Sequence, residues 1–171
     1  MNIIQEFENI RSQILKTDAY LAELIRKLEN NSEIVEMQTA GNFETVYPIT
    51  VNPAIFKGKK PTAVIFGNER VETSKWNKVA EEIMQRCNLD AEKHVALMNL
   101  RGKIRGRDRV LLAKEEGDMH RPAKIDENLY METHYDAESL MRILMTRILD
   151  AVDYDYSDIL VSTRNANLRR G

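Results

Sequence analysis

Basic residues recur at every second position in the segment Arg101-Gly-Lys-Ile-Arg-Gly-Arg-Asp-Arg109. They are Arg101, Lys103, Arg105, Arg107 and Arg109. On an extended chain this period of two places all the basic side chains on one face. Such a row suits a phosphate backbone, because neutralising successive phosphates supplies much of the affinity for nucleic acids. The alternative is a flexible, solvated connection between a helix and a strand.

The distribution of charge along the chain also indicates a basic surface. The 171 residues carry a formal net charge of −2, which divides into −4 over residues 1–56, +7 over 57–114 and −5 over 115–171. Lys57, Lys59 and Lys60 belong to the basic part, and we expect them to support the row in binding nucleic acid. Basic and acidic segments that simply neighbour each other in the fold would give the same distribution.

A cluster of carboxylates and an imidazole follows the basic row. Glu115, Glu116, Asp118 and His120 could hold a divalent metal, with Asp108 nearby. A metal-dependent nuclease acting on RNA or DNA would place such a cluster beside a basic groove. The spacing matches no recognisable metal-binding pattern, however, and consecutive glutamates on a loop are usually solvated. We therefore expect no metal or cofactor, and the nuclease remains an alternative.

A second histidine, His134, follows a predicted strand in Glu132-Thr-His134. A histidine beside a carboxylate at a strand end could transfer protons. It could equally order the turn between the strand and the next helix. We favour this structural role, because no nucleophile accompanies the pair.

The first residues, 1–31, predict one long helix. Its apolar positions alternate spacings of four and three: Ile3, Phe7, Ile10, Ile14, Thr17, Leu21, Leu24 and Leu28. This is a heptad seam, which cannot bury itself alone. It can pack on a second copy as a homodimer, on a partner, or on its own domain. Ile10, Ile14, Leu21 and Leu24 are the candidate partner-binding residues.

The remaining chain divides into a connector at 32–60, a core domain at 61–162 and a basic tail at 163–171. The connector has one possible strand, Glu44 to Val51, which Pro48 would confine to a sheet edge. In the core we expect strands at 62–66, 69–72, 109–113, 128–132 and 158–162. Three helices, capped by Ser74, Asp90 and Asp136, lie among them. The order β-β-α-α-β-β-α-β predicts an α+β fold with a mainly antiparallel sheet and helices on one face.

Composition narrows the class of protein. The chain has one cysteine, Cys87, so no disulfide framework is expected. No run of 18 apolar residues or signal-peptide core stands out, so we expect a cytoplasmic protein that does not enter a membrane.

Residues 61–162 resemble an uncharacterised α+β module found in small proteins of bacterial mobile elements, phages and restriction-associated loci. The resemblance is carried by the runs PTAVIFGNERVETSKWNKVAEEIM and GRDRVLLAKEEGDMHRPAKIDENLYMETHYDAESLMRILMTRIL. Four segments follow in the same order as in that module. They are the strand, turn and strand before Ser74-Lys-Trp76, the basic stretch that leads into Arg109, the turn at 121–125 and Tyr130-Met-Glu-Thr133. The resemblance implies a setting, the conflict between mobile DNA and host nucleases. It supplies no catalytic residues.

Together these observations predict a non-catalytic protein of a phage or mobile element that binds RNA, DNA or a nucleoprotein. The sharpest form is an inhibitor of a CRISPR or restriction nuclease, of the anti-CRISPR type. In that form the basic face would hold or displace guide RNA, or the acidic ends of the chain would mimic a nucleic acid. A coiled-coil structural adaptor is a further alternative.

Overall fold

The computed structural model describes residues 3–35, 44–117 and 119–166, with side chains omitted at 27–35. It divides into two units, residues 1–37 and 38–171. None of the helices among the described residues is long and apolar enough to cross a membrane.

The first unit contains a single α-helix, α1, Ile3–Val35. Its sequence has no proline or glycine to interrupt the turns, and the long helix expected at the N-terminus is confirmed. Apolar residues of the seam, including Ile10, Ile14 and Leu21, are more than half exposed on this helix.

The second unit is an α+β domain whose strands pair antiparallel, as expected. The strands form two sheets rather than one. The larger sheet has the order β1-β7-β2-β3 and the smaller has the order β4-β6-β5. The bounds are β1 Thr45–Pro48, β2 Lys59–Phe66, β3 Glu69–Glu72, β4 Leu112–Ala113, β5 Pro122–Asp126, β6 Leu129–Glu132 and β7 Ile159–Asn165.

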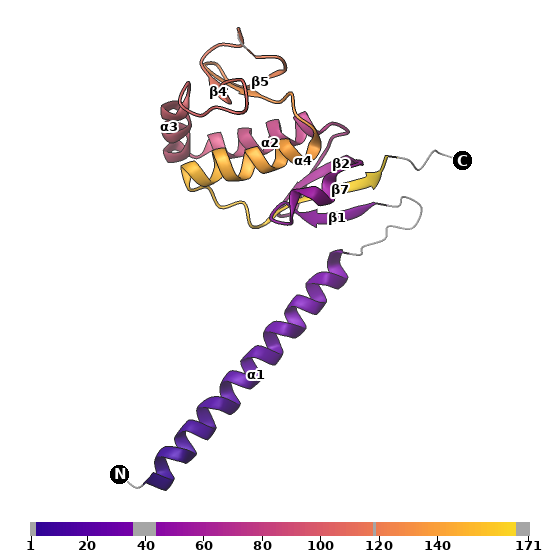
Figure 1. Ribbon diagram of the computed structural model, residues 1–171. Coiled ribbons are helices and arrows are strands. Elements are labelled where there is room, and N and C mark those ends of the chain that lie inside the picture. The colour runs from indigo at the N-terminus through magenta and orange to yellow at the C-terminus, as the bar shows by residue number, and fades with distance from the viewer. Residues whose placement is uncertain (1–2, 36–43, 118, 167–171) are drawn as a thin grey trace, which may run out of the picture. The chain divides into compact units, whose positions relative to one another are not determined.

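Helices lie between the two sheets (Figure 1). Helix α2 contacts β2 of the larger sheet, β5 of the smaller sheet and helix α4, so it joins the parts of the domain. The helices are α2 Trp76–Leu89, α3 Ala91–Leu100, α4 Ala137–Ile143, the π-helix η2 Leu144–Leu149, and the 3-10 helices η1 Pro53–Phe56 and η3 Asp150–Val152. The buried faces of α2 and α4 meet β-strand side chains such as Val64 and Val161 in one hydrophobic core.

Two of the three expected helix caps are present. The Asp90 carboxylate accepts the N–H groups of Glu92 and Lys93, and Asp136 accepts that of Ser139. Ser74 does not cap α2: the helix begins at Trp76, and Lys75 occupies the capping position without a side-chain hydrogen bond. Trp76 instead donates its indole N–H to the Lys59 carbonyl, which fixes the start of α2 on β2.

Several expected boundaries were wrong. The segment from Arg121 to Ile125, expected as a turn, contributes most of the edge strand β5, where Pro122 stands first and needs no ladder N–H. The strand expected at 109–113 is reduced to Leu112–Ala113. Strand β7 continues to Asn165, three residues into the expected tail, and residues 167–171 lie outside the described residues.

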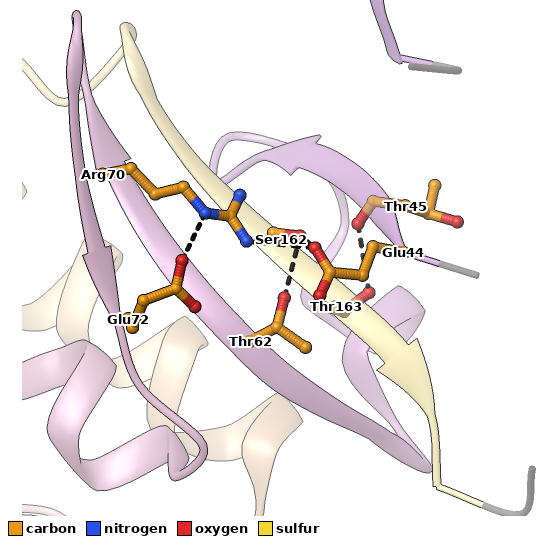
Figure 2. A network of polar contacts seen from close by, with 7 residues as sticks. All are labelled: Glu44, Thr45, Thr62, Arg70, Glu72, Ser162 and Thr163. Carbon is orange, nitrogen blue, oxygen red and sulfur yellow. Dashed lines mark hydrogen bonds and ion pairs between the residues drawn. The ribbon is translucent and has the colours of Figure 1, made fainter. Parts of the chain in front are cut away.

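A chain of polar contacts joins β2, β7 and β3 of the larger sheet to the residue that precedes β1 (Figure 2). The Thr62 hydroxyl on β2 donates to Ser162 on β7, and Ser162 donates to Glu44, which precedes β1. Arg70 on β3 then bonds both Glu44 and Glu72. Ser162 alternates with the core residue Val161, so the network lies on the face turned away from the helices. The network supplies hydrogen-bond partners to the fully buried Ser162 hydroxyl. Its role is therefore structural.

Candidate functional site

The basic row is a hairpin rather than a single extended strand. The Gly106 N–H donates to the Arg109 carbonyl at 2.7 Å, and the Leu111 N–H donates to the Ile104 carbonyl at 2.9 Å. Arg105 and Val110 form a bridge between the two arms. The chain therefore reverses at residues 106–109, and the expected face of five aligned cations does not form. We call residues 102–112 the basic hairpin.

Arg101 has a structural role at the base of this hairpin. Its Nε donates to the Met98 carbonyl at the end of α3, and its Nη1 donates to the Asn128 carbonyl. A cation at the C-terminus of a helix donates hydrogen bonds to the last carbonyl groups and is attracted to the negative end of the helix dipole. Gly102 follows with a φ of +74°, a conformation that favours glycine and that lies outside the helical range, so α3 ends at Leu100.

The hairpin is held against the rest of the domain near its turn. Arg147 on η2 donates to the Arg105 carbonyl at 3.1 Å. Gly106 lies directly against Tyr135, since a Cβ at this position would stand 2.3 Å from the tyrosine hydroxyl oxygen. Arg105 and Arg107 are left exposed on an anchored turn, while Arg109 is half-buried behind it.

A buried carboxylate, Glu132, ties the neighbouring segments together. Its oxygens accept the backbone N–H groups of His120 at 2.7 Å, Arg121 at 3.0 Å and His134 at 2.9 Å. The Glu132 N–H itself donates to the Leu111 carbonyl at the end of the hairpin. Glu132 is 1% exposed, so these hydrogen bonds are shielded from water. One residue thus fixes the hairpin, the loop before β5 and the turn after β6.

The pKa of Glu132 reflects this arrangement. Burial opposes ionisation and would raise the pKa. The N–H donors of His120, His134 and Arg121, with the positive charge of Arg109, outweigh burial and hold the pKa of the carboxyl below its ordinary value of 4.5. Glu132 is therefore an ionised structural group at neutral pH.

Both histidines singled out in the sequence lie at one cavity of about 280 Å³. The ring centroids of His120 and His134 are 5.1 Å apart, with a 45° angle between the planes. Both side chains are exposed, while their backbone N–H groups are fixed by Glu132. The cavity is lined by Arg107, Asp108, Arg109, His120, Glu132, His134 and Tyr135. We call it the two-histidine pocket.

The pocket gathers charged groups of both signs around the two imidazoles. Two guanidinium groups, Arg107 and Arg109, lie with two carboxylates, Asp108 and Glu132. The guanidinium and imidazole N–H groups are of the kind that donates to an anion such as a phosphate oxygen.

The other expected site residues are distributed elsewhere. Glu115 lines a different cavity with Lys114 and Met119, and Asp118 lies outside the described residues. Across the described part of the chain, no group of three or more His, Cys, Asp or Glu side chains is placed to hold a metal ion. Lys59 and Lys60 begin β2 in the larger sheet and Lys57 follows η1 just before it, whereas the basic hairpin leads into the smaller sheet.

The pocket combines residues from three separate segments of sequence, which local patterns did not connect. His120 precedes β5, His134 follows β6, and Arg109 closes the hairpin. Compared with protein-family models, with characterised proteins and with solved structures, the chain gives no match.

We predict that Glu132→Gln lowers the free energy of unfolding at pH 7 by about 2–4 kcal/mol, because an amide offers one acceptor oxygen to three buried N–H groups. The folded pKa of Glu132 lies below its unfolded value of 4.5, so its stabilisation is complete above pH 4.5 and is lost as the pH falls through the folded pKa. Urea denaturation at pH 7 and pH 3.5 measures the difference.

The matched control is Glu127→Gln, which changes an exposed carboxylate on the neighbouring β-turn. We expect it to leave stability unchanged within about 0.5 kcal/mol. Equal stabilities of wild type and Glu132→Gln at pH 7, or a difference that persists undiminished at pH 3.5, would contradict the role given to Glu132.

Proposed function

We propose that this protein binds the phosphate groups of a nucleic acid, free or within a nucleoprotein, through the basic hairpin and the two-histidine pocket. One observation carries the proposal: the anchored hairpin brings Arg107 and Arg109 to the same cavity as His120 and His134. All of these groups can donate hydrogen bonds to phosphate oxygens.

The shape of the surface favours a chain of phosphates over a small enclosed ligand. The hairpin presents Lys103 and Arg105 to solvent outside the pocket, next to Arg107 at the pocket itself. A nucleic-acid backbone could place one phosphate in the pocket and its neighbours along these cations. Contacts of this kind position a backbone without reading its bases.

The narrower form of the proposal is inhibition of a host nuclease. The resemblance of residues 61–162 to a module of phages, mobile elements and restriction-associated loci supports it. In this form the hairpin competes for the guide RNA or the target DNA of the nuclease.

A second candidate function is RNA cleavage without a metal, and the paired imidazoles favour it. One neutral histidine would take the proton from a ribose 2′-hydroxyl as the 2′-oxygen forms a bond to phosphorus. The bond from phosphorus to the 5′-oxygen would break, and the protonated second histidine would give its proton to that oxygen. The products are a 2′,3′-cyclic phosphate and a free 5′-hydroxyl, with Arg109 close to the developing charge.

The first prediction of this proposal concerns salt. Replacing Arg105 and Arg107 with Gln removes two exposed charges from the hairpin, and we expect affinity for random RNA and DNA to fall equally for all sequences. The slope of log affinity against log salt should flatten by roughly 0.7 per lost contact on single strands and 0.9 on duplex DNA. Fluorescence anisotropy over a salt series measures both.

The matched control replaces Lys57, just before β2, and Lys60, on β2, with Gln, which removes the same charge beside the larger sheet. We expect it to leave the slope nearly unchanged. If the lysine variant flattens the slope and the arginine variant does not, the binding surface lies on the larger sheet and the proposal is wrong.

The second prediction concerns the two-histidine pocket. The variant His120→Asn/His134→Asn removes both imidazoles, and we expect it to bind RNA and DNA more weakly while retaining the salt response of the hairpin. Equal affinities of wild type and variant would remove the pocket from the binding surface.

The third prediction separates binding from cleavage. Wild-type protein is incubated with RNA in EDTA, and with DNA of the same sequence. We expect intact RNA, bound but not cut. Products ending in 2′,3′-cyclic phosphate, absent for DNA and for the double asparagine variant, would instead establish the second candidate. Cleavage that requires Mg²⁺ or Mn²⁺ would favour the metal-dependent nuclease.

A further inference from the structure

The helix α1 leaves an apolar seam exposed. Phe7, Ile10, Ile14 and Leu21 are each at least half exposed, and a groove follows Ile10, Ile14 and Leu21 along the helix. A single helix of this kind gains little stability without a partner that buries its apolar side.

Thr17 interrupts the seam, but its hydroxyl does not oppose burial. It donates to the Gln13 carbonyl one turn earlier, at 2.9 Å. The polar group is therefore satisfied within the helix, and the threonine methyl group can face an apolar neighbour.

We infer that the seam binds the α1 helix of a second copy of this chain, running antiparallel. Seam residues of the two helices then face each other when their numbers add up to 31. In this register Phe7 lies opposite Leu24 of the second copy, and Ile14 lies opposite Thr17.

Charge complementarity supports a second copy of this chain as the partner. In the antiparallel pair, Arg11 beside the seam faces Asp18 of the second copy, and the twofold axis repeats this contact. The same edge brings Ile4 opposite Ile25, which adds apolar contact at both ends of the pair. All these residues are exposed on α1, so they are accessible to a partner helix.

A parallel pair uses the same residues less well. It would set Thr17 against Thr17 in the centre and Asp18 beside Gln13, leaving only Arg11 with an opposite charge, at Glu6. Ile4 would lose its apolar partner. Each direction pairs Arg11 with one carboxylate, but only the antiparallel pair gives Ile4 an apolar partner and separates the two Thr17 side chains, so these contacts favour the antiparallel direction.

Cysteine crosslinking tests the register on the full chain. The native Cys87 is fully buried, and burial raises the pKa of its thiol to about 12, so it stays protonated and does not interfere. The variants Phe7→Cys and Leu24→Cys are purified separately. Each variant is oxidised alone, and the two are also oxidised as a mixture. We expect disulfide-linked dimers in the mixture only. Dimers of Phe7→Cys alone would show a parallel pair and overturn the inference.

Charge exchange tests the proposed contact. Asp18→Arg places arginines opposite each other twice, and sedimentation equilibrium should show the dissociation constant rise about tenfold. The double variant Arg11→Asp/Asp18→Arg should restore association. The control Glu8→Arg makes the same charge change away from the seam and should have little effect. A weak dimer has a dissociation constant on the order of 100 μM. A wild-type chain that stays monomeric at this concentration would overturn the inference. A double variant that fails to recover association would overturn it as well.

Discussion

The described site depends on the hydrogen bonds that the buried carboxylate of Glu132 accepts. Three backbone N–H groups from two separate segments converge on it, and its own N–H reaches the end of the basic hairpin. A charge can remain in such a place because its hydrogen bonds replace those lost to water. The two histidines are consequently set side by side by their backbones, while their rings remain free to meet solvent.

This division of roles separates the structural residues from those available for binding. Glu132, Arg101 and Tyr135 are engaged with the backbone or with the packing of the hairpin. Arg105, Arg107, His120 and His134 project from the framework that these residues hold. A basic segment that the sequence presents as uniform therefore contains both kinds of residue, and only the structure distinguishes them.

Local patterns predicted the parts of the fold that local interactions determine. The heptad spacing of α1, the apolar face of α2 and the caps at Asp90 and Asp136 all follow from contacts within a few residues. The reversal at 106–109 was missed, because alternating basic residues fit an extended chain and a hairpin equally well. The pocket was missed because it requires β5 to pair with β6, and the polar residues of β5 concealed that strand.

The larger sheet ends in two strands that discourage further pairing. The edge strands β1 and β3 have four residues each; β1 ends at Pro48, which lacks an N–H, and β3 carries Glu69, Arg70 and Glu72. Short, charged or proline-bearing edges are the usual protection against growth of a sheet from molecule to molecule. Copies of this domain can therefore be crowded together without their larger sheets joining into fibrils.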